Sequence, residues 1–216
     1  MRLCELLKIE KGVTSIIGSG GKTTLMLTLA RELEKQGRVI VTTTTHIKAP
    51  EGIPLYDRLQ PFFESCACFG RRNEEGKLSA TEGGIEPMLP LADYILVEAD
   101  GSKRLPIKAH ASHEPVIPAC TNKVILVVGA SGFLQPVKRV VHRIEPFCSL
   151  TGLSEDELVT PEAVAEVIKK EALCDCVFIN QVDNDEMREL AKLLCRRLDL
   201  PVYAGALNKE EWECLS

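Results

Sequence analysis

The segment Gly18-Ser-Gly-Gly-Lys-Thr-Thr24 is the clearest chemical motif in the sequence. It lies between a β-branched run at 13–17 and an amphipathic segment, which predicts a strand, a tight loop and a helix start. A helix start offers unpaired N–H groups and partial positive charge to an anion. In such loops the lysine reaches the β- and γ-phosphates and the threonine hydroxyl holds Mg²⁺. We therefore predict that ATP or GTP, with Mg²⁺, binds the loop residues Gly18, Ser19, Gly20, Gly21, Lys22, Thr23 and Thr24.

The loop is shorter than the usual phosphate-binding loop. Ile16 stands where that motif has its first glycine, five residues before the Gly-Lys pair. The remaining Gly-x-x-Gly-Lys-Thr form is also found in amide ligases of the Mur type. The alternative is a plain glycine turn, but the position between strand and helix favours phosphate binding.

Two carboxylates follow a buried strand in Ile95-Leu-Val-Glu-Ala-Asp-Gly101. Carboxylates suit Mg²⁺, a hard cation, and NTPases hold the metal at such a strand end. We predict that Glu98 or Asp100 holds Mg²⁺ or orients the attacking water. Glu98 to Gly101 also fits an acidic-x-x-Gly switch, in which the glycine amide senses the γ-phosphate. A solvated strand end is the alternative.

Two weaker candidates lie at other strand ends. The hydroxyls of Thr44 and Thr45, in the run Val41-Thr-Thr-Thr-Thr45, could meet the γ-phosphate or Mg²⁺, although threonine is also a common strand residue. Asn180-Gln-Val-Asp183 resembles the Asn-Lys-x-Asp element that recognises guanine, with glutamine in place of lysine. We expect Asn180 and Asp183 to contact the base; the alternative is an ordinary loop before a helix.

Histidines and cysteines give no strong metal pattern. His110, His113, Glu114 and His142 do not have zinc-site spacing, so we expect no dedicated metal site there. The pairs Cys66/Cys68 and Cys174/Cys176 could share a metal or a chalcogen, but core packing is favoured. The nearby Lys103, Arg104 and Lys108 could meet phosphate or an acidic partner, although loop charges are usually solvated.

Short apolar runs alternate with amphipathic segments through most of the chain. This pattern predicts an α/β fold with three layers, in which a mostly parallel sheet of P-loop NTPase-like topology is covered by helices. We expect strands at 13–17, 38–43, 94–97, 124–128, 176–179 and 201–204, and helices at 22–36, from Pro161, and around 187–198. Residues 1–216 would form a single domain. An irregular insertion at about 46–90 would contain a β-hairpin, with Cys66–Phe69 and Leu78–Ala80 flanking the turn at 73–76.

Composition limits the cellular setting. The net charge of −5, from 26 Lys+Arg and 31 Asp+Glu, argues against nucleic acid as the main partner. The charged start, Met1-Arg-Leu-Cys-Glu5, is unlike an export signal, and we find no apolar run of about 20 residues, the length of a membrane span. We expect a cytoplasmic protein that does not enter a membrane, with its nine cysteines reduced.

Taken together, these motifs resemble the YqeC family of selenium-dependent hydroxylase accessory proteins, also described as selenium cofactor biosynthesis proteins. The resemblance covers nearly the whole chain and rests on the segments 17–24, 41–45, 97–101, 105–108, 113–115 and 141–143. It implies a role in maturing selenium-dependent molybdenum hydroxylases, with such a hydroxylase or its cofactor-maturation proteins as partners.

Three functions fit these observations. The first is a Mg²⁺-dependent NTP hydrolase that matures a metalloenzyme, with Lys22 stabilising charge on the transferred phosphoryl group. The second is a small-molecule kinase or ATP-dependent ligase, which the short loop suggests. The third is a nucleotide-sensing module that does not hydrolyse its ligand. The choice between ATP and GTP stays open.

Overall fold

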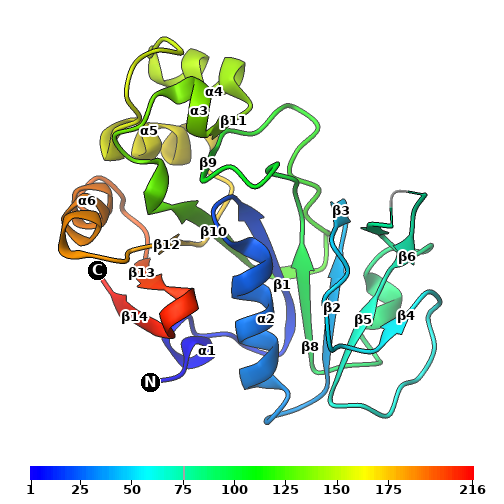
Figure 1. The fold of residues 1–216 in the computed structure, drawn as a ribbon. Helices are drawn as coiled ribbons and strands as arrows, with labels where there is room; N and C mark the ends of the chain where they lie inside the picture. The colour runs from blue at the N-terminus through cyan, green and yellow to red at the C-terminus, as the bar shows by residue number, and fades with distance from the viewer. Residues whose placement is uncertain (75) are drawn as a thin grey trace. The chain divides into compact units, whose positions relative to one another are not determined.

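The computed structural model describes residues 1–74 and 76–216, and its fold class is α/β, with a mostly parallel sheet flanked by helices (Figure 1). The chain divides into two compact units. The first contains residues 1–17, 23–101 and 116–124, and the second contains residues 18–22, 102–115 and 125–216. The fold class is as predicted, whereas the single domain over residues 1–216 stays a prediction.

The first unit is built on parallel strands in the order β1-β8-β2-β5-β4. Their bounds are β1 Gly12–Gly18, β8 Tyr94–Glu98, β2 Val39–Thr43, β5 Cys66–Phe69 and β4 Leu55–Tyr56. In register, Glu98 lies between Ile16 of β1 and Thr43 of β2. The end of β8 is therefore flanked by the end of β2 and by the strand that leads into the glycine loop.

Helix α2 (Lys22–Leu33) carries the predicted apolar face, and Leu25, Leu29 and Leu33 are all buried. It ends three residues before the predicted Gln36, and the amide of Gly37 then donates to Leu33 O at 3.1 Å. With 12 residues it is the longest described helix. No helix in the described part of the chain is long and apolar enough to span a membrane.

The insertion contains an antiparallel hairpin, but one of its two strands differs from the prediction. Cys66–Phe69 is β5 of the parallel sheet, not a hairpin strand, because its four residues are all buried between β2 and β4. Leu78–Ser79 (β7) instead pairs antiparallel with Arg71–Arg72 (β6) and with His46–Ile47 (β3), in a small separate sheet. In the expected turn at 73–76, residue 75 lies outside the described residues. Two further short helices of this unit are α1 Leu3–Leu6 and η1 Glu86–Met88.

The second unit has the strand order β10-β12-β13-β14, in which β14 alone of these four pairs antiparallel. Strand β10 (Thr121–Gly129) begins in the first unit and ends in the second. The other strands are β12 Cys176–Asn180, β13 Val202–Ala206, β14 Glu211–Cys214, β9 Ile107–Lys108 and β11 Val141–His142, of which β9 and β11 form a separate parallel pair.

Two helices of the second unit begin after residues whose side chains cap them. Helix α5 (Pro161–Glu171) starts after Thr160, whose Oγ1 accepts from Ala163 N at 3.2 Å. Helix α6 (Asp185–Cys195) starts after Asn184, whose side chain accepts from Met187 N at 2.9 Å. These caps satisfy amides that have no partner within the helix. The remaining helical segments are α3 Val137–Val140, α4 Ile144–Thr151, η2 Ala130–Gly132 and η3 Leu207–Lys209.

Candidate phosphate and metal site

The glycine loop of the second unit is shaped by close backbone contacts. Its glycines have left-handed backbone angles, with φ of +89° at Gly18, +89° at Gly20 and +132° at Gly21. A Cβ atom on Gly18 would lie 2.3 Å from Val127 O, and one on Gly20 would lie 2.4 Å from the backbone of Gly129. Glycine is therefore required by both conformation and space. The amide of Ser19 also donates to Val127 O at 2.9 Å, which fixes the loop on β10.

Asn180, at the end of β12, braces this loop. Its Nδ2 donates to Gly20 O at 2.8 Å and its Oδ1 accepts from Leu207 N at 3.1 Å. The residue is 6% exposed, and a Cβ on Gly21 would lie 2.2 Å from its Nδ2. Both ends of the amide are thus bonded to backbone, so Asn180 holds the loop and the β13 exit together. Its contact with a nucleotide base stays a prediction.

The neighbours of Asn180 lie in more open positions. Gln181, with φ of +65°, accepts from Ser131 Oγ at 2.6 Å. The side chain of Asp183 is 44% exposed, and Lys209 Nζ lies 3.4 Å from its Oδ1. Asp183 therefore retains an accessible carboxylate, and its role in base recognition stays a prediction.

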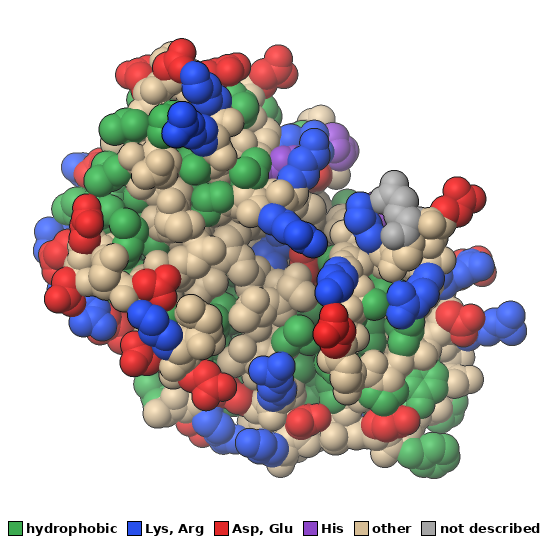
Figure 2. Space-filling model, in the orientation of Figure 1, with side chains coloured by type: hydrophobic (Ala, Val, Ile, Leu, Met, Phe, Trp, Pro, Cys, Tyr) green, Lys and Arg blue, Asp and Glu red, His purple; other side chains and the backbone are tan. Residues whose placement is uncertain are grey.

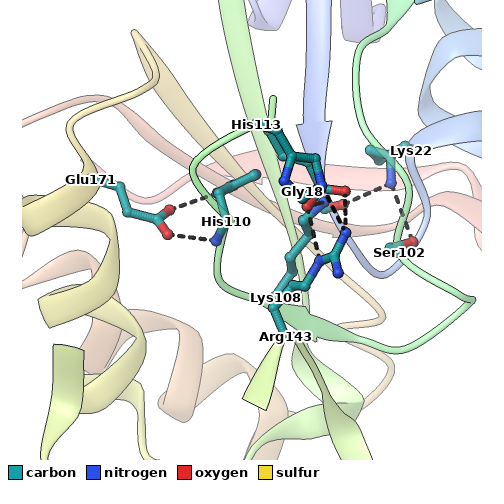
Figure 3. Close-up of polar contacts among 9 residues, drawn as sticks. Gly18, Lys22, Ser102, Lys108, His110, His113, Arg143 and Glu171 are labelled. Carbon is teal, nitrogen blue, oxygen red and sulfur yellow. Dashed lines mark hydrogen bonds and ion pairs between the residues drawn. The ribbon is translucent and has the colours of Figure 1, made fainter. Parts of the chain in front are cut away.

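Lys22 is folded back over its own loop. Its Nζ donates to Gly18 O at 2.7 Å and to Ser102 Oγ at 3.2 Å, and the residue is 3% exposed (Figure 3). Sequence reasoning missed Ser102, although it directly follows the Gly101 that fits the switch pattern. Among the described residues, the buried Ser19 Oγ has no hydrogen-bond partner. An unsatisfied buried hydroxyl costs about 1–3 kcal/mol, which a ligand oxygen would relieve.

The candidate metal ligands lie in the first unit. Thr23 Oγ1 donates to Glu98 Oε2 at 2.7 Å, and Glu98 is 7% exposed. Asp100, two residues on, is completely buried. Glu98 thus contacts the loop threonine of the same unit. Hydroxyl and carboxylate oxygens are hard ligands that fit Mg²⁺.

The threonine run mainly joins the ends of β2 and β8. Thr43 Oγ1 donates to Glu98 O at 2.8 Å, and it accepts from Thr45 N at 2.9 Å. Thr44 Oγ1 donates to Val116 O at 2.8 Å. Thr43, which sequence reasoning did not single out, thus fixes the backbone of the acidic strand end. Contacts of Thr44 and Thr45 with phosphate or Mg²⁺ stay predictions.

The histidines and cysteines have other surroundings. Buried His110 pairs with Glu171, with 2.7 Å between Nδ1 and Oε2. Burial raises the pKa of Cys66 and of Cys68 to about 12, so these thiols stay protonated and pack as apolar groups on β5. In the described residues no cluster of three or more His, Cys, Asp or Glu side chains could hold a metal ion.

Comparison with known proteins places the chain in a family. The family model for YqeC protein matches residues 14–145. The chain belongs to the YqeC family. It is 36% identical over 162 residues to the "Uncharacterized protein YqeC" of Escherichia coli (strain K12). That match covers 67% of this chain and 62% of the relative's length. The family match includes Lys22, Glu98 and Arg143, whereas Asn180 and Asp183 lie beyond it.

Proposed function

We propose that this member of the YqeC family binds a nucleoside triphosphate with Mg²⁺ on the loop Gly18–Thr24 and hydrolyses it. The observation that carries the proposal is the bond from Thr23 Oγ1 to Glu98 Oε2, 2.7 Å long, at the carboxyl end of β8. A loop threonine and a strand-end acid are the two protein groups through which P-loop NTPases hold Mg²⁺. Thr23 and Glu98 would hold the ion, which would supply positive charge to offset the negative charge of the transferred phosphoryl group.

The loop supplies the phosphate-binding part of the proposal. Its positive-φ glycines leave the backbone free of side chains, and Ser19 Oγ is buried without a bonding partner among the described residues. When a phosphate binds, Lys22 Nζ would give up its hydrogen bonds to Gly18 O and Ser102 Oγ and donate to the phosphate oxygens instead. Lys22 and Thr23 are consecutive residues, so one short segment presents both the cation and the metal-ligating hydroxyl.

The partner is proposed from the family resemblance. Nucleotide binding and release would gate the delivery or insertion step that matures a selenium-dependent molybdenum hydroxylase. Ser102 lies next to Gly101 in the chain and contacts Lys22, so its loop is a candidate for the segment that changes with the nucleotide. ATP and GTP are both candidates, and Asp183 would select between them.

Calorimetry with Mg·ATP and Mg·GTP tests the proposal. Lys22→Ala is expected to weaken binding at least about tenfold, because a charged hydrogen bond contributes about 1.5–3 kcal/mol. Lys35→Ala, at an exposed position just after α2, is the matched control and should bind as the wild type does. Thr23→Ala and Glu98→Gln should remove the dependence of affinity on Mg²⁺. Unchanged affinity in Lys22→Ala would exclude the loop as the phosphate site.

Turnover measurements separate the three possible uses of the nucleotide. Phosphate release without an acceptor supports hydrolysis. A strict requirement for a small acceptor would replace hydrolysis with group transfer, and tight binding with no turnover would leave a sensor. Asp183→Ala, assayed with both nucleotides, should lose base preference while keeping its Mg²⁺ dependence.

A further inference from the structure

Three sequence segments that the nucleotide proposal does not use meet in the second unit: 105–108, 113–115 and 141–143. Strands β9 and β11 pair in parallel, which puts Lys108 beside His142. Glu114 Oε2 lies 3.0 Å from Lys108 Nζ, and Glu114 Oε1 lies 2.9 Å from Arg143 Nη2. We call Lys108, His113, Glu114, His142 and Arg143 the basic cluster.

The basic cluster carries more positive than negative charge. Lys108 and Arg143 both pair with one carboxylate, that of Glu114. The sequence led us to expect a solvated Lys108, but its side chain is fully buried. Burial, followed by the charges of Lys108 and Arg143, lowers the pKa of His142 to about 4. The charge of Lys103 also lowers the pKa of His142. His142 therefore stays neutral at pH 7, and the two cations Lys108 and Arg143 outnumber the one carboxylate of the cluster.

Part of this charge is accessible. The side chain of Arg143 is 35% exposed and its Nη2 lies 3.3 Å from Nε2 of the exposed His113. Figure 2 shows histidine side chains adjoining Lys or Arg side chains on the surface. Arg143 is also the N-cap of α4, where it makes no side-chain cap hydrogen bond. The Arg143 guanidinium and the His113 imidazole thus lie side by side at a partly exposed position, which suits an anion.

One chain segment joins the basic cluster to the glycine loop within the second unit. Ser102 accepts from Lys22, and Pro106 O accepts from Gly129 N at 2.8 Å beside Gly20. The same segment continues to Lys108 (Figure 3) and then to Glu114, whose Oε2 lies 3.0 Å from Lys108 Nζ. Release of Ser102 from Lys22 on phosphate binding would change one end of the segment whose other end carries Lys108 and Glu114.

We propose that the basic cluster binds a second anion, the oxyanion or carboxylate group of a small-molecule co-substrate, next to the segment that responds to the nucleotide. Arg143 and His113 contact the anion. Lys108 and Glu114 are positioning residues, because Glu114 holds the Nε and Nη2 edge of the guanidinium and Lys108 offsets the charge of Glu114. The role of this anion as a co-substrate rests on the proposed nucleotide-dependent function. Binding of an anion to the basic cluster does not depend on that function.

Anion titration followed by histidine NMR tests this proposal, with inorganic phosphate, sulfate and acetate as probes. Phosphate or acetate should shift the His113 resonances in the wild type and equally in Lys22→Ala, where the loop is impaired. Arg143→Gln should weaken this binding at least about tenfold, since charged hydrogen bonds of about 1.5–3 kcal/mol are lost. Arg139→Gln, at an exposed position on α3, is the control and should bind as the wild type does.

The comparison of phosphate and acetate tells an oxyanion site from a carboxylate site. Arg143→Lys keeps the charge and guards against misfolding; it should bind more weakly than the wild type and more tightly than Arg143→Gln. Unchanged binding in Arg143→Gln, or loss of all His113 shifts in Lys22→Ala, would overturn the proposal. Mg·nucleotide affinity is measured in parallel: its absence from the wild type would refute the nucleotide function while leaving anion binding at the basic cluster intact.

Discussion

Asn180 is the side chain on which the shape of the glycine loop most directly depends. It bonds Gly20 O and Leu207 N at the same time, in a position that excludes water. Asn180→Ala would leave both backbone groups without this partner. We expect a loss of about 1–3 kcal/mol in the free energy of unfolding, together with weaker nucleotide binding.

Urea unfolding of Asn180→Ala measures this loss, with Asn208→Ala at an exposed position of η3 as the control. A variant as stable as the wild type would show that water or a relaxed loop replaces the amide.

Residue types and order along the chain predict which side chains stand at strand ends, but not which backbone groups they meet. The Asn-x-x-Asp spacing identified Asn180 as a candidate. Its bond to Gly20 O joins residues 160 positions apart, which no local pattern encodes. Thr43 and Ser102 were missed for the same reason: their partners, Glu98 O and Lys22 Nζ, are set by strand register and by loop path.

At the scale of elements, glycine is required at Gly20 both by its left-handed backbone and by the lack of space for a Cβ atom, and a comparison with Gly52 separates these two constraints. Gly20→Ala introduces both a left-handed alanine and a contact with the Gly129 backbone, whereas Gly52 has a φ of +78° and nothing within 4 Å of the position that a Cβ would take. We expect Gly20→Ala to lose clearly more stability than Gly52→Ala, whose cost is the backbone strain of about 1–3 kcal/mol alone.

Thermal unfolding of the two glycine variants measures the difference. Equal losses would show that β10 moves away from the loop at little cost. Nucleotide affinity should fall only in Gly20→Ala, because Gly52 lies outside the candidate site.

Elements with strong local signals were predicted well. The Thr160-Pro161 start of α5 and the apolar face of α2 follow from capping and from helical periodicity. One strand of the predicted hairpin, Cys66–Phe69, was assigned incorrectly because β5 is buried on both faces, so its Cys-Ala-Cys-Phe run shows no alternation that would distinguish a hairpin from a parallel strand. Helices α1 and α3, of four residues each, are too short to show periodicity.

For the molecule as a whole, the basic cluster makes stability depend on pH. The pKa of His142 is about 4 in the folded protein because of burial and nearby cations, against 6.5 ordinarily. Between pH 6.5 and pH 4 the unfolded chain therefore binds the proton and the folded protein does not. Acidification through this range should lower the free energy of unfolding by up to about 1.4 kcal/mol per pH unit from this group.

Urea unfolding at several pH values in that range checks the sign. His142→Gln should flatten the slope, and His46→Gln, at an exposed position, should not. At lower pH, Glu114 also makes the free energy of unfolding depend on pH. Burial alone would raise the pKa of Glu114, but hydrogen bonds from Arg143 and Lys108 lower this pKa to about 2. Its contribution is present above about pH 4.5 and is lost toward pH 2. A slope that persists in His142→Gln would assign the acid sensitivity to other groups.

The resting position of Lys22 has a consequence for how such a protein would be used repeatedly. A buried ammonium with no acceptor would make the fold dependent on its ligand, as a structural zinc domain depends on its metal. Here Gly18 O and Ser102 Oγ, both groups of the protein itself, accept from the lysine. Lys22 can therefore be hydrogen-bonded with or without a bound phosphate, so a cycle between a loaded and an empty form would not require the fold to open around this lysine.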